Sequence, residues 1–124
     1  MNPGIQKITD LRIYNQAYDL SMDIFKLASG FPKKEMYSLT DQVIRSSRSV
    51  AANIREGYAR REYEKVFIRH LSTAIGSAEE TRTWLAFARD CNYVEDKKYK
   101  ELDDAYDGLS AMIYRLSKNW TTFK

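Results

Sequence analysis

The chain has 124 residues and a net charge of +3, with 44% hydrophobic and 30% charged residues, which is the composition of one globular domain rather than of a disordered or fibrous chain. A chain of this size buries a core without disulfides or a metal, and its single cysteine, Cys91, excludes an internal disulfide. It has no signal peptide and no apolar run of about 18 residues, so we expect a cytoplasmic protein with no membrane partner.

Apolar residues at helical spacing predict four helices in succession. The first is expected between a cap at Thr9 or Asp10 and Gly30, because glycine commonly follows the last turn of a helix. The second is expected between the N-cap Ser38 and a C-terminus near Gly57.

The third helix is expected from about residue 63 to 89 and the fourth from about 95 to 120. Gly76 lies in the middle of the third, where glycine costs about 1 kcal/mol relative to alanine, so we expect another helix to approach it closely. The expected core residues are Ile13, Ala17, Leu20, Ile24 and Leu27; Leu39, Val43, Val50, Ile54 and Tyr58; Phe67, Leu71, Ala74, Ala78, Leu85 and Ala88; and Leu102, Tyr106, Leu109, Ile113, Leu116 and Trp120. Four long helices joined by short turns predict an all-α fold, a single antiparallel up-down-up-down four-helix bundle over residues 1–124 with its core at about 10–120.

A row of polar residues runs beside the apolar stripe of the second helix. Its members are Gln42, Ser46, Ser49, Asn53 and Glu56. Buried polar groups need hydrogen-bond partners, so we interpret the row, together with Glu80, as a structural network between helices. The alternative is a ligand site. The expected partners of Glu56 are Arg60, Arg69 or Arg82.

Arginine is concentrated in the second helix and the joint that follows it. Residues 45–61 contain five arginines and one acid, and the planar guanidinium group binds phosphate through two parallel hydrogen bonds. The expected nucleic-acid-binding residues are Arg45, Arg48 and Arg55 on the side of the helix opposite its core, Arg60 and Arg61 in the joint, and Tyr58 and Tyr63 as stacking partners for unpaired bases. The alternative is a solvated helix face that only keeps the protein soluble.

Two helices carry apolar residues outside their core stripes, which favours self-association. The expected interface residues are Val66, Thr73, Gly76, Trp84 and Phe87 on the third helix and Tyr14, Tyr18 and Phe25 on the first. We therefore expect a homo-oligomer.

Catalytic signatures are missing from the sequence. His70 is the only histidine, no Glu-x-x-His motif of a di-iron bundle occurs, and no glycine-rich phosphate loop occurs. We expect no enzymatic activity, no metal and no cofactor.

Short pieces spread over about residues 10–118 resemble one protein family. They are Asp10-Leu11 and Ala17; Phe31-Pro32 and Glu35; Tyr37-Ser38-Leu39 and Gln42; Ser49, Ala52-Asn53-Ile54 and Glu56-Gly57; Arg60-Arg61; Phe67, Leu71, Ala74, Gly76-Ser77 and Glu80; and Ala88 with Asn92-Tyr93. This ordered set is similar to the four-helix-bundle proteins named after the intervening sequences of bacterial 23S ribosomal RNA genes. The family pattern usually has proline at Ala51, a small residue at Arg55 and often an acid at Arg82.

The resemblance implies a closed bundle that assembles as a homopentamer and whose biochemical function is unsettled. It also implies a relation to accessory proteins of the reverse transcriptases of diversity-generating retroelements, which use a basic surface to contact nucleic acid. We therefore expect a non-catalytic homo-oligomer that associates with RNA or a ribonucleoprotein. The alternative is a scaffold that binds a nucleic-acid-processing protein without touching nucleic acid itself.

Overall fold

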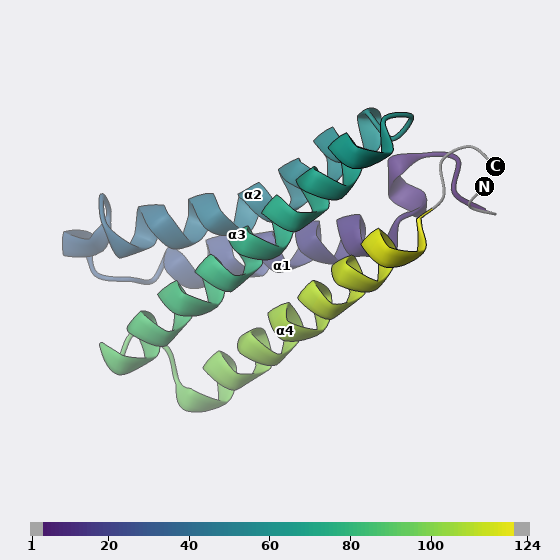
Figure 1. Cartoon of the computed structure of the whole chain (residues 1–124). Coiled ribbons are helices and arrows are strands. Elements are labelled where there is room, and N and C mark those ends of the chain that lie inside the picture. Colours follow the sequence, from purple (N-terminus) through teal and green to yellow (C-terminus); the bar gives the residue numbers. More distant parts are fainter. Residues whose placement is uncertain (1–3, 121–124) are drawn as a thin grey trace.

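The structure, a computed structural model, describes residues 4–120. It contains four long helices, α1 (Arg12–Ala28), α2 (Leu39–Ala59), α3 (Glu64–Asp90) and α4 (Asp96–Asn119), and two 3-10 turns, η1 (Ile8–Asp10) and η2 (Lys33–Glu35). Consecutive helices run in opposite directions, and the start of α1 lies at the same end of the bundle as the end of α4 (Figure 1). The predicted all-α four-helix bundle is confirmed. No helix in the described part of the chain is long and apolar enough to cross a membrane.

One continuous core fills the space between the helices. The residues expected there are all buried except Leu27 and Leu116, which are half-buried. At the end where α2, α3 and α4 meet, the rings of Tyr58, Phe67 and Trp120 pack edge to face, with 4.8 Å between the Phe67 and Trp120 centroids. Aromatic rings prefer this geometry because the positive edge of one faces the negative face of another.

Gly57 allows α2 and α3 to approach each other closely. A Cβ atom at this position would lie 2.5 Å from Cβ of His70 and 3.0 Å from the ring of Phe67, so no larger residue fits without movement of the helices. The helix ends at Ala59, two residues beyond Gly57 and close to the expected position. The close approach predicted at Gly76 is absent from residues 4–120, since a Cβ there would meet nothing within 4 Å.

Ser38 is the N-cap residue of α2, as expected, but Glu35 supplies the side-chain hydrogen bond at this end of the helix. The Ser38 side chain makes no capping hydrogen bond, whereas the Glu35 carboxylate accepts one from the Leu39 amide at 3.4 Å and another from the Tyr93 hydroxyl at 2.8 Å. A carboxylate near a helix N-terminus is favourable because the helix dipole is positive there. The hydrogen bond between Tyr93 and Glu35 raises the pKa of Tyr93. It also connects the turn between α1 and α2 to the turn between α3 and α4.

Arg82 joins α3 to α4. Its guanidinium group donates to Asp103 at 2.7 Å, to Asp107 at 3.1 Å and to Glu79 at 3.2 Å. The hydrogen bond to Asp103, and to a lesser extent the one to Glu79, raises the pKa of Arg82 above its usual value. Arg82 therefore forms its ion pairs across the bundle with Asp103 and Asp107 of α4. The expectation that it pairs with Glu56 was wrong.

Candidate nucleic-acid interface

The polar row of α2 faces α3 and forms a ladder of hydrogen bonds with it. The Ser46 and Thr81 hydroxyls lie 2.8 Å apart, and the Ser49 and Ser77 hydroxyls lie 2.9 Å apart. Thr81 and Ser46 are buried, and besides this contact the Thr81 hydroxyl lies 2.9 Å from the Ser77 carbonyl and the Ser46 hydroxyl 3.3 Å from the Val43 carbonyl, so both buried hydroxyls have hydrogen-bond partners. This arrangement fixes the register of the two helices.

Asn53 extends the ladder toward Gly57. Its amide nitrogen donates to the Ser49 carbonyl at 2.9 Å, and its amide oxygen lies 3.2 Å from Nδ1 of His70. His70 comes from α3 and is held between Asn53 and the close crossing at Gly57. Asn53 therefore orients the only histidine of the chain, which is consistent with a structural role rather than a ligand-binding one.

Three polar residues lie outside this ladder. The Glu56 side chain is 63% exposed and approaches Nδ1 of His70 at 3.8 Å, and it forms no ion pair with Arg60 or Arg69 in the part of the chain that the structure describes. Glu80 accepts a hydrogen bond from the indole of Trp84 on its own helix. Gln42 is exposed. Glu80 and Gln42 therefore do not join helices as expected, and Glu56 does so only through His70.

Two of the arginines of α2 lie against α1 rather than pointing away from the bundle. Nη1 of Arg55 donates to the Tyr14 hydroxyl at 3.3 Å, and its Cζ lies 5.8 Å from the Tyr14 ring centroid. Cζ of Arg48 lies 5.5 Å from the ring centroid of Phe25. Both arginines are exposed, so their guanidinium groups lie on aromatic rings and remain open to solvent.

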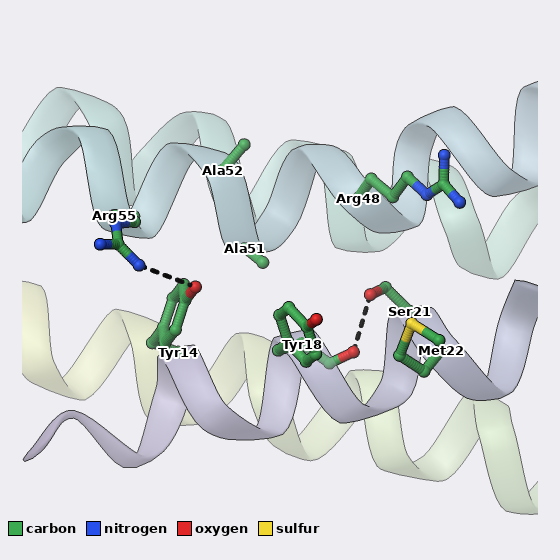
Figure 2. A pocket seen from close by; sticks show the side chains of 8 residues that line it. All are labelled: Tyr14, Tyr18, Ser21, Met22, Arg48, Ala51, Ala52 and Arg55. Atoms are coloured by element: carbon green, nitrogen blue, oxygen red, sulfur yellow. Dashed lines mark hydrogen bonds between the residues drawn. The ribbon is translucent and has the colours of Figure 1, made fainter. Parts of the chain in front are cut away.

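A groove of about 360 Å³ lies between these contacts, along the α1–α2 boundary. It is lined by Tyr14, Tyr18, Ser21, Met22, Arg48, Ala51, Ala52 and Arg55. Figure 2 shows the tyrosines on the side of α1 that faces α2, with Arg55 reaching toward Tyr14 and the small side chain of Ala51 projecting from α2 toward α1. The lining contains two cations and no acid. The groove therefore combines positive charge with exposed aromatic surface.

The remaining predicted nucleic-acid-binding residues are divided between surface and core. Arg45 and Arg60 are exposed, and Tyr63, next to the start of α3, is 60% exposed. Tyr58 is only 6% exposed, because it packs on Phe67 and Trp120. The prediction that it stacks on bases was therefore wrong.

Arg61 is half-buried and covers the Tyr58 ring. Its Cζ lies 4.0 Å from the ring centroid, and its Nη1 donates to the Tyr58 carbonyl at 3.0 Å. Arg61 thus closes the C-terminal end of α2, as basic groups at a helix C-terminus often do. It is less available to an external phosphate than its neighbour Arg60.

The outer side of α3 carries the second predicted surface. Phe87 is 54% exposed, and its ring lies 5.9 Å from that of the half-buried Trp84. Thr73 and Gly76 are exposed and Val66 is half-buried on the same helix. The Tyr14, Tyr18 and Phe25 set lies instead beside the arginines of α2, so within one chain the two predicted interface sets belong to different surfaces.

Residues 4–120 contain no group of three or more His, Cys, Asp or Glu side chains placed to hold a metal ion. The residues of these surfaces that were not predicted from the sequence include Thr81, His70, Ser21, Met22 and the pair Ala51–Ala52. Thr81 and His70 belong to α3, whereas the polar row that they contact belongs to α2. The alanines carry no chemical signal except their small size, which leaves the groove open.

The fold and these surfaces define a small, all-α, single-bundle protein whose second helix presents arginine beside aromatic residues. Residues 9–115 match the model of the 23S rRNA-intervening sequence protein family, and the chain belongs to that family.

A solved structure of another protein has the same fold. It is the crystal structure of a protein of unknown function from the S23 ribosomal protein family of Bacteroides thetaiotaomicron, with a TM-score of 0.78 and 21% identity, covering 86% of this chain and 96% of that one. No curated protein matches this chain.

Proposed function

We propose that the protein is a non-catalytic, cytoplasmic homo-oligomer that associates with RNA or with a ribonucleoprotein through the arginines of α2. The observation that carries the proposal is the concentration, within the described part of the chain, of arginines without a carboxylate partner on α2 and at its C-terminal end. Arg82 and Arg89 form ion pairs with carboxylates. Within residues 4–120, no carboxylate lies within ion-pair distance of Arg45, Arg48, Arg55 or Arg60.

Guanidinium groups that have no carboxylate partner among the described residues, on α2 and at its C-cap residue Arg60, suit a polyanion. Each retains the planar fork of donors that matches phosphate oxygens, and several such groups together attract a nucleic acid over a longer range than one does. An arginine surface that served only solubility would tolerate neighbouring acids, as the exposed Lys100–Asp104 pair of α4 illustrates. The family name, which refers to sequences within 23S rRNA, points to RNA as the polyanion.

Self-association is supported by the outer side of α3. Trp84 and Phe87 form an aromatic pair that is partly open to solvent, and Gly76 leaves space for a close neighbour. Large aromatic side chains in such positions are typical of the centres of protein interfaces. Repetition of the α2 arginines around an oligomer would strengthen their combined field. The family resemblance suggests five copies.

The second candidate function is a protein-binding scaffold that uses the Trp84–Phe87 surface for a different protein, such as a reverse transcriptase, and does not bind nucleic acid. Filter binding of a labelled 23S rRNA fragment to the purified protein, at about 50 mM and 200 mM salt, separates the two. Binding through phosphate contacts weakens steeply between these concentrations. Absence of binding at both would favour the scaffold.

A further inference from the structure

The α1–α2 groove joins residues that the sequence assigned to two different roles. Tyr14 and Tyr18 were expected in a subunit interface, and Arg48 and Arg55 in a nucleic-acid surface. In the structure all four line one groove (Figure 2). A ligand that lies along this groove between the two arginines therefore also meets the two tyrosines.

The arginines mark the two ends of this groove. They are seven residues apart on α2, which corresponds to about 10 Å along the helix axis. Arg55 lies on Tyr14 at one end and Arg48 lies on Phe25 at the other. These contacts hold the charges at fixed positions while leaving them exposed, because an aromatic ring attracts a cation without neutralising it.

Tyr18 lies between the two ends with its ring available. It is 51% exposed, its centroid lies 6.3 Å from that of Tyr14, and no cation covers it among the described residues. The Ser21 hydroxyl donates a hydrogen bond to the backbone carbonyl of Tyr18 at 2.7 Å. This bond does not involve the Tyr18 side chain. A flat ligand of the size of a nucleobase has an aromatic surface to stack on here.

We propose that this groove binds an unpaired segment of RNA, with a base stacked on Tyr18 and neighbouring phosphates at Arg48 and Arg55. The inference rests on the proposed RNA association and specifies its substrate class. A duplex offers the same phosphates but keeps its base faces stacked inside, so it satisfies the arginines and leaves Tyr18 unused. An acidic peptide also satisfies only the arginines. Unpaired RNA uses both components of the groove, and the absence of acids from its lining suits a polyanion.

The test is fluorescence anisotropy with a labelled ten-nucleotide uridine oligomer and a blunt RNA duplex of equal length. Tyr18→Ala should weaken binding of the single strand by about fivefold or more, the lower end of base–aromatic stacking, and should change duplex binding by less than about twofold. Tyr18→Phe, which keeps the ring, should bind like the parent protein. Tyr114→Ala is the matched control, since Tyr114 is 54% exposed on α4 with Lys118 5.1 Å from its ring, and it should leave both affinities unchanged.

The outcomes distinguish the inference from the function on which it rests. If the parent binds RNA but Tyr18→Ala behaves like Tyr114→Ala, or if the duplex binds as well as the single strand, the groove is not the site and the RNA association stands. A labelled glutamate decamer that binds more tightly than the uridine oligomer would assign the groove to an acidic protein. If the parent binds neither RNA, both proposals fail.

A second measurement covers the case in which Tyr18→Ala does not fold. A uridine oligomer containing 4-thiouridine is cross-linked to the parent protein with light, and tryptic peptides are identified by mass spectrometry. Cross-links in residues 13–26 or 49–55, the α1 and α2 walls, support the groove. Cross-links confined to α3 or α4 overturn it.

Discussion

Replacing Gly57 by alanine tests the account of how α2 and α3 cross. In an open helix the change from glycine to alanine stabilises by about 1 kcal/mol. At Gly57 the new methyl group would lie 2.5 Å from Cβ of His70. A Cβ atom cannot rotate away, so the helices must separate, and overpacking of this kind costs about 3 kcal/mol at the upper end of its usual range. We expect a net loss of about 2 kcal/mol in the free energy of unfolding.

Gly108→Ala provides the matched control. Gly108 lies within α4, and a Cβ there would meet nothing within 4 Å, so the same substitution should stabilise by about 1 kcal/mol. For a chain of this size 1 kcal/mol corresponds to about 4 °C in Tm. Thermal denaturation followed by circular dichroism should therefore show the two variants moving in opposite directions, by about 8 °C downward and about 4 °C upward. A Gly57→Ala protein as stable as Gly108→Ala would refute the close crossing.

Three further predictions concern the ladder, the core and the outer side of α3. Asn53→Ala should lower the free energy of unfolding by about 1–3 kcal/mol, because it leaves polar groups of the ladder unpaired. Glu56 is exposed, so Glu56→Ala should change the free energy of unfolding by less than about 0.5 kcal/mol. Urea titration measures both changes. Burial raises the pKa of Tyr106, so as pH rises the unfolded chain loses the phenol proton before the folded chain does, near pH 10. The contribution of Tyr106 to the free energy of unfolding should therefore be fully present below about pH 10 and decrease as pH rises above it. Tyr106→Phe removes a hydroxyl that makes no hydrogen bond within residues 4–120, so it should reduce that decrease without destabilising the protein at neutral pH. Trp84→Glu should convert the oligomer to smaller species in light scattering while the melting of the monomer changes little, since a charge buried at an apolar interface costs several kcal/mol; a parent protein with the mass of one chain would contradict the self-association on which this prediction depends.

The helices and the core were predictable because the apolar stripes have the period of an α-helix. The polar row was predictable on the same basis, but its partners were not. Which residues of α3 face Ser46 and Asn53 depends on the register of two helices, and that register depends in turn on Gly57. A glycine near the end of a helical pattern is more often a stop signal, so the sequence favoured that interpretation.

The surfaces were harder to predict than the core. Helical spacing placed Tyr58 on the core stripe, while its closeness to Arg60 and Arg61 in the sequence suggested a surface position. In the structure Tyr58 lies in the core, where it contacts Trp120, a residue distant in sequence. Arg48 and Arg55 lie opposite the core of an isolated helix. In the bundle the long aromatic side chains of α1 extend far enough to reach them, and this contact has no signature in the sequence of α2.

The salt dependence of RNA binding by a variant that lacks three of these arginines tests the central proposal most directly. Changing Arg48, Arg55 and Arg60 together to alanine is compared with changing Lys97, Lys98 and Arg115, three exposed cations of α4, so that both variants lose the same charge. The account predicts that the first variant binds more weakly across unrelated sequences and that its plot of log affinity against log salt is shallower by slightly less than about one unit for each lost phosphate contact. The second variant should keep most of the parent slope. Equal slopes in the two variants would contradict an RNA-binding surface on α2.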